Sequence, residues 1–121
     1  MRCVEMKPGR SYDVLLKYSQ GITEALRELV EKEGIENGYI SAGLGGFDRF
    51  AMRYAGGVET RWDGAILQLS SVEGFIEDGR VEVYASVTQD GADKITRGGL
   101  VEDGTTRMFY CELFVQELLP V

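Results

Sequence analysis

The fold is decided by V-E-V-Y-A-S-V-T-Q-D-G-A-D-K-I-T-R-G-G-L, residues 81–100. In its first seven residues every second position is apolar, which predicts a half-buried strand. Gln89-Asp90-Gly91 predicts a turn, and Ile95-Thr96 resumes an extended segment that reaches the glycine pair Gly98-Gly99. The polar side chains of Glu82, Tyr84 and Ser86 thus share one face of the strand, and the glycine pair lets another backbone come close to it. We take these polar residues and the two glycines as the candidate site.

The segment 22–30 has the spacing of an amphipathic helix. Its apolar residues recur at i, i+3, i+4, i+7 and i+8 and form one stripe that faces a sheet: Ile22, Ala25, Leu26, Leu29 and Val30. Gly34 predicts a left-handed residue after the helix, and Ile35 is expected to pack inward behind it. At the start, Ser19 is a candidate N-cap, and Gly21 weakens the first turn.

The remaining segments read as strands separated by turns. Turns are expected at Lys7-Pro8-Gly9, Gly56-Gly57, Asp63-Gly64 and Glu77-Asp78-Gly79. Strands are expected at 2–6, 12–18, 38–46, 47–54, 58–62, 65–74 and 106–118. One helix among many strands predicts a single α+β domain, 1–121, with a twisted and mainly antiparallel sheet.

The last expected strand, 106–118, carries apolar residues on both of its faces. Such a strand needs cover on both sides, and a chain of 121 residues with one helix cannot easily supply it. We therefore expect a subunit interface over part of the sheet.

Composition limits the classes of partner and of chemistry. The net charge of -7 and the isoelectric point near 4.6 argue against DNA as a default partner, because DNA affinity comes mostly from Lys and Arg. The chain has no histidine, the commonest general base and metal ligand. Cys3 and Cys111 are far apart in sequence and are expected to be reduced, buried thiols. With no signal peptide and no apolar run of membrane length, a cytoplasmic protein without membrane contact is expected.

Four short motifs, in order, resemble the PPC domain, which is conserved in plants and prokaryotes and often labelled DNA-binding. They are Y-I-S-A-G-L-G at 39–45, Q-L-S-S-V-E-G at 68–74, E-V-Y-A-S-V at 82–87 and R-G-G-L at 97–100. The resemblance covers nearly the whole chain. It implies a twisted antiparallel sheet flanked by the helix, assembled as a homotrimer, and a fold related to acetolactate decarboxylases.

The chain departs from this family where prokaryotic relatives carry histidines that suggest a metal site. Glu82, Tyr84 and Gly99 occupy those positions, and Gln68 replaces the glutamate that precedes the serine-rich strand. One carboxylate and one phenol cannot rebuild a three-ligand zinc site, so we expect neither metal nor cofactor. The chain also lacks the R-G-R-P hook with which plant members reach the minor groove.

These observations leave three hypotheses. The first is a non-catalytic ligand-binding or regulatory module, whose subunit clefts hold a small molecule through Gln68, Glu82, Tyr84, Arg97, Gly98 and Gly99. In it, Arg97 pairs with an anionic ligand or with Glu82, and the same residues could instead form a structural ion pair at the trimer seam. The second is DNA binding, disfavoured by charge, and the third is a histidine-free enzyme that uses Glu82 and Tyr84.

Overall fold

The computed structural model describes residues 1–54, 57, 59–89, 95–103 and 107–121. Within these ranges one helix and six strands follow one another: β1 (Met6–Leu15), α1 (Ile22–Glu33), β2 (Gly38–Arg53), β3 (Glu59–Glu77), β4 (Arg80–Gln89), β5 (Thr96–Val101) and β6 (Arg107–Pro120). The expected α+β class, with one helix and a mainly antiparallel sheet, is confirmed. The expected turns at Gly56 and at Asp90-Gly91 lie outside the described residues.

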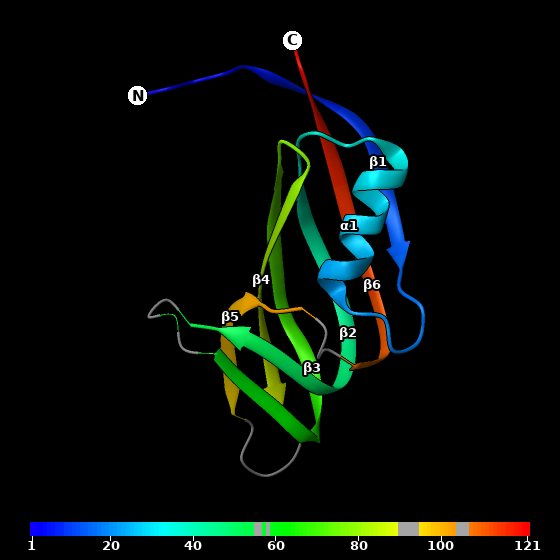
Figure 1. The fold of residues 1–121 in the computed structure, drawn as a ribbon, viewed down its shortest axis with the longest axis vertical. Coiled ribbons are helices and arrows are strands. Elements are labelled where there is room, and N and C mark those ends of the chain that lie inside the picture. The colour runs from blue at the N-terminus through cyan, green and yellow to red at the C-terminus, as the bar shows by residue number, and fades with distance from the viewer. Residues whose placement is uncertain (55–56, 58, 90–94, 104–106) are drawn as a thin grey trace.

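All six strands belong to one antiparallel sheet with the order β1-β6-β2-β3-β4-β5. β5 also pairs with the end of β2, Met52 with Val101 and Arg53 with Leu100. The strands β2 to β5 therefore close on themselves at the lower end of the molecule, while β1 and β6 extend the open part of the sheet (Figure 1).

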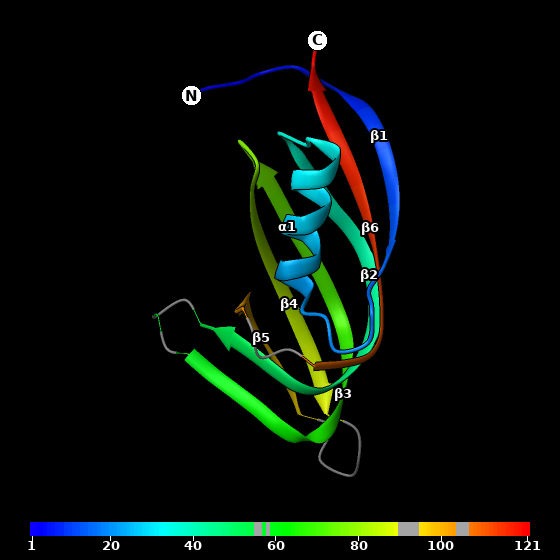
Figure 2. The same cartoon turned by 45° about the vertical axis from the view of Figure 1, so that its right-hand side comes forward.

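The helix lies against one face of the sheet, as both views show (Figures 1 and 2). Its predicted stripe is confirmed, because Ile22, Ala25, Leu26 and Val30 are buried. Gly34 is the expected left-handed residue, with φ of 67°, and Ile35 is buried behind it. Gly21 is the N-cap, so Ser19 does not cap the helix. Val83, Leu113 and Phe50 are buried in the same hydrophobic core as this stripe.

Two predicted turns are wrong. Lys7-Pro8-Gly9 continues as part of β1, because β1 is an edge strand on which proline costs no ladder hydrogen bond. A register shift between Pro8 and Ser11 takes up the irregularity, and residues 2–5 precede the strand. Asp63-Gly64 lies inside β3, where a second register shift bends the strand between the pairs Phe47–Leu67 and Arg49–Asp63.

The hairpin between β3 and β4 is confirmed. Asp78 and Gly79 both have positive φ, 51° and 76°, as a two-residue turn between twisted antiparallel strands requires. Of the two cysteines, Cys111 is buried as expected, whereas Cys3 is exposed because it lies in the segment before β1.

Candidate ligand-binding site

The pairing of β4 with β5 brings together three of the predicted site residues. Tyr84 lies opposite Leu100, and Gly98 and Gly99 lie opposite Ser86 and Ala85. Tyr84 and both glycines line one cavity of about 470 Å³, completed by Arg53, Tyr54, Gly57 and Leu100. This volume is within the usual range for small-molecule sites.

The glycine pair is needed where β5 crosses onto β2. A Cβ atom at Gly99 would lie 2.7 Å from the backbone oxygen of Arg53, closer than real side chains approach. At Gly98 the corresponding contacts are 3.2 Å to the Ser86 Cβ and 3.3 Å to the Ala85 oxygen. The two glycines therefore let the strands close, and they leave a cavity wall of bare backbone.

The polar groups around this cavity are held by one another. The Tyr84 hydroxyl donates a hydrogen bond to Glu82 Oε1, and this bond, with burial as a smaller cause, raises the pKa of Tyr84. Arg53 Nε donates to Glu102 Oε1 at 2.5 Å, and Arg53 Nη1 donates to the Gly57 oxygen at 2.7 Å. A cation and an oriented phenol oxygen thus stand at the cavity wall in fixed directions.

Gln68 and Arg97 lie apart from this group. Gln68 is opposite Thr88 on β4, and Arg97 is opposite Val87. Five residues of strand, about 16 Å at the usual rise, separate Val87 from Glu82. Arg97 and Glu82 are therefore not neighbours in the sheet, and the ion pair considered between them does not form at this register.

A row of hydroxyl groups, which the sequence reasoning missed, crosses three strands on the same outer face. Ser86 Oγ lies 2.6 Å from Ser71 Oγ and 3.1 Å from Ser70 Oγ, and Thr88 Oγ1 donates to Ser70 Oγ at 3.1 Å. Thr88 Oγ1 also lies 2.8 Å from Thr96 Oγ1. A register shift between Leu69 and Ser71 places both Ser70 and Ser71 within reach of Ser86. Because this shift has no signal in the sequence, only the alternation of Ser86 with Thr88 could be recognised there.

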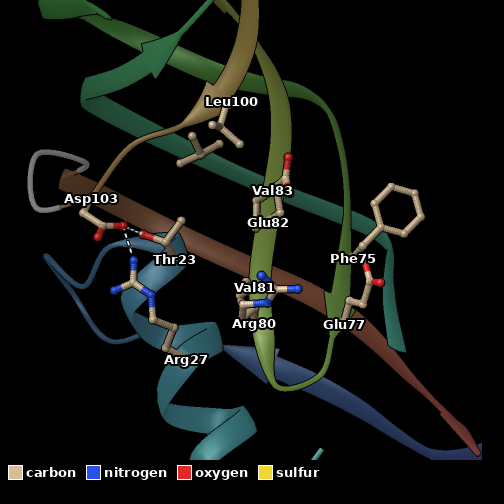
Figure 3. A pocket seen from close by; sticks show the side chains of 11 residues that line it. Thr23, Arg27, Phe75, Glu77, Arg80, Val81, Glu82, Val83, Leu100 and Asp103 are labelled. Carbon is tan, nitrogen blue, oxygen red and sulfur yellow. Dashed lines mark hydrogen bonds and ion pairs between the residues drawn. The ribbon is translucent and has the colours of Figure 1, made fainter. Parts of the chain in front are cut away.

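A second cavity, of about 470 Å³, lies between the start of α1 and β4 (Figure 3). At one side, Asp103 accepts hydrogen bonds from Thr23 Oγ1 at 2.7 Å and from Arg27. These bonds, that of Thr23 first, lower the pKa of Asp103. Glu82 also lines this second cavity, and its hydrogen-bond partner Tyr84 lines the first one. The Glu82–Tyr84 pair therefore contributes one side chain to each cavity.

Glu82 and Gly99, where the resemblance led us to expect metal ligands, are placed as follows. Glu82 accepts the Tyr84 hydrogen bond, and Gly99 has neither a side chain nor room for one. Within the described part of the chain, no group of three or more Cys, Asp or Glu side chains is placed to hold a metal.

An antiparallel sheet that closes on itself at one end, beside a single helix and with a cavity at the closure, defines the class of protein. The chain belongs to the Plants and Prokaryotes Conserved (PCC) domain family, whose model matches residues 4–119. No curated protein sequence matches it significantly.

Several solved structures share the fold. A metal-containing protein from Archaeoglobus fulgidus is 21% identical with a TM-score of 0.81, over 99% of this chain and 87% of that one. A plant- and prokaryote-conserved protein from Pyrococcus horikoshii is 23% identical with a TM-score of 0.78, over 100% and 87% of the two chains. A suggested DNA-binding protein from Bacteroides thetaiotaomicron is 19% identical with a TM-score of 0.70, over 93% and 82%.

In the described ranges, no helix has the length and apolarity needed to span a bilayer.

Proposed function

We propose that this chain is a non-catalytic small-molecule-binding module and that its ligand occupies the cavity beside Tyr84, Gly98 and Gly99. The observation that carries the proposal is the composition of that cavity. Two tyrosine side chains, Tyr54 and Tyr84, and bare glycine backbone line it together with the Arg53 side chain. Aromatic rings with a few oriented polar groups are typical of small-molecule sites.

The chemistry of the wall points to a flat, partly apolar ligand with a hydrogen-bond donor. The Tyr84 hydroxyl donates its hydrogen bond to Glu82. Its oxygen can therefore accept a hydrogen bond from the ligand. We propose that an acidic group on the same ligand shares the Arg53 guanidinium with its partners Glu102 and Gly57. An aromatic compound that bears both a carboxylate and a hydroxyl or amine combines these features.

A non-catalytic role is favoured over an enzyme by the state of Glu82. The Glu82 carboxylate is already engaged as the hydrogen-bond acceptor of Tyr84, and the chain has no histidine, the commonest general base. We further propose that the family's metal site is lost in this chain. Elemental analysis that found stoichiometric zinc after purification would contradict this part.

The same proposal includes a homotrimer assembled through the outer face of the sheet. Tyr39, Phe75 and Phe114 are 38%, 59% and 40% exposed on this face, although they lie on adjacent strands. Tyr39 is opposite Phe75 in the register, so the aromatic side chains are contiguous. Exposed apolar patches of this kind mark interaction sites. Light scattering should give about 40 kDa, three chains of 13.4 kDa, and Phe114→Glu should lower it.

DNA binding is the second candidate, supported by the similarity in fold to the suggested DNA-binding protein from Bacteroides thetaiotaomicron. Three chains of charge -7 would carry -21, which opposes approach to a duplex. We expect no steeply salt-dependent shift of duplex DNA at micromolar protein. A sub-micromolar affinity that falls steeply with salt would favour DNA over the small ligand.

The experiment for the small ligand is a saturation-transfer NMR screen of aromatic hydroxy- and amino-carboxylates. Binders should lose their signal with Tyr84→Ala and keep it with Tyr110→Ala. The control is matched, because Tyr110 also lies on the outer face and also donates its hydroxyl to a glutamate two residues away. Equal loss in both variants, or no binder at all, would count against the site.

A further inference from the structure

The first half of β4 has one unpaired edge. β5 pairs with β4 only from Thr88 to Tyr84, and then crosses to β2, where the Glu102 N–H donates to the Ala51 oxygen at 3.0 Å. Among the residues that the structure describes, Arg80–Val83 consequently has a ladder partner in β3 alone. Such an edge is a template for another strand.

The direction of the backbone groups can be assigned from the register. The Gln89 N–H donates to the Ile95 oxygen on the β5 side, at 2.8 Å. Because backbone groups alternate along a strand, Val87, Ala85, Val83 and Val81 face the same side. Within the described ranges, no backbone group pairs with Val81 on this side. Its N–H and C=O therefore face the open edge, whereas Val83 is fully buried and lies at the inner end of that edge.

This edge opens into the cavity of Figure 3 rather than onto a flat surface. Val81, Val83, Leu100 and Val101 supply apolar wall, and charged side chains stand around them: Arg27, Glu77, Arg80, Glu82 and Asp103. Val81 is only partly buried, so a partner strand beside it would meet both a backbone ladder and the apolar cavity wall.

The chain also carries an extended segment ahead of its first strand. Residues 1–5 precede β1 and all are exposed, Val4 by 55%. In both views this arm passes over the end of the sheet, and its tip lies beyond the β3–β4 hairpin at the opposite edge from β1 (Figures 1 and 2). Arg2 and Val4 line a hollow with Phe75 and Glu77 of that hairpin. The arm thus leaves its own protomer close to the hairpin that leads into the open edge.

We infer that the arm of one copy adds to the open β4 edge of another as an antiparallel strand, with Glu5 opposite Arg80 and Val4 opposite Val81. Side chains opposite each other share a face, so Val4 enters the apolar cavity and Glu5 meets the Arg80 guanidinium. The inference rests on the proposed homo-oligomer and adds a specific contact to it.

The alignment makes Cys3 the neighbour of Glu82. Because Val81 would bond to the arm at Val4, the adjacent residues Cys3 and Glu82 form a non-hydrogen-bonded pair, with Cα atoms about 4.5 Å apart. A disulfide spans roughly that separation. The variant Glu82→Cys should therefore cross-link to Cys3 under mild oxidation. Glu73→Cys is the matched control, since it is exposed on the neighbouring strand at the same face, opposite Tyr84.

The experiment mixes unlabelled and ¹⁵N-labelled Glu82→Cys protein, oxidises it, and reads disulfide-linked peptides by mass spectrometry. We expect mixed-isotope Cys3–Cys peptides, at least ten times more abundant than with Glu73→Cys. Equal yields in the two variants, or peptides linked only within one chain, would overturn the inference. Light scattering on the same samples separates the two claims. An oligomer without the cross-link overturns the arm contact alone, whereas a monomer overturns the proposed assembly as well.

Discussion

The sharpest prediction concerns Glu117, a nearly buried carboxylate on β6. Arg10 on β1 holds it with three hydrogen bonds, from the backbone N–H and Nε to Oε1 and from Nη2 to Oε2, each 3.0 Å. The carboxylate is 5% exposed. These bonds, those of the guanidinium first, lower its pKa from a usual 4.5 to about 2. Glu117 therefore fastens the edge strand to the sheet.

The shift sets the size of the effect. A fall of about 2.5 pKa units corresponds to roughly 3.4 kcal/mol between the charged and neutral forms. The Arg10 side chain is half exposed, and water screens the pair, so we expect about 1–2 kcal/mol. Because the folded pKa is depressed, this stability is present above about pH 4.5 and is lost as the pH falls toward 2.

The assay is urea unfolding followed by circular dichroism at several pH values between 7 and 2. Glu117→Gln should lower the free energy of unfolding by about 1–2 kcal/mol at pH 7, and the difference from wild type should shrink between pH 4.5 and 2. Glu33→Gln is the control, because its contact with Arg10 is 3.4 Å and partly exposed, worth under about 1 kcal/mol. A Glu117→Gln cost no larger than that of Glu33→Gln, or one independent of pH, would refute the reasoning.

Three further outcomes follow from single positions. Burial raises the pKa of Cys111 to about 12, so at pH 8 iodoacetamide should label the exposed Cys3 in the native protein and reach Cys111 only after unfolding. Gly99→Ala should lower the free energy of unfolding, measured by thermal unfolding, by about 1–3 kcal/mol, because its Cβ would lie 2.7 Å from the Arg53 backbone oxygen. Gly98→Ala should cost less, because its nearest contact is 3.2 Å. Equal costs for the two variants would contradict the close crossing of β5 over β2. Gly34→Ala should cost about 1 kcal/mol despite the open space around it, because its φ is 67°.

Elements that depend on local pattern could be predicted from the sequence. The helical stripe from Ile22 to Val30, the Asp78-Gly79 hairpin and the alternation after Val81 each carry their signal within a few residues. Pro8-Gly9 and Asp63-Gly64 have the composition of turns yet lie within strands. Whether these residues form a turn or part of a strand depends on the position of the strand in the sheet, because an edge strand tolerates proline and a bent strand can include Asp-Gly. That position is set by contacts between distant residues, so it could not be predicted from the local sequence.

The candidate site was predictable only in part. Tyr84, Gly98 and Gly99 were close enough in sequence to be grouped by one hairpin, and the structure places them on one cavity. Arg53 and Tyr54 join them through the pairing of β2 with β5, which spans more than forty residues and leaves no trace in the sequence. Arg97 was grouped by proximity in the chain, but the register carries it away from Glu82.

The most direct test of the ligand-binding claim is a crystal structure of the protein grown with the strongest binder from the NMR screen. We expect density for the binder between Tyr54 and Tyr84, against Gly98 and Gly99, with its acidic group toward Arg53. Density for the binder at any other place, with this cavity filled by water alone, would contradict the account.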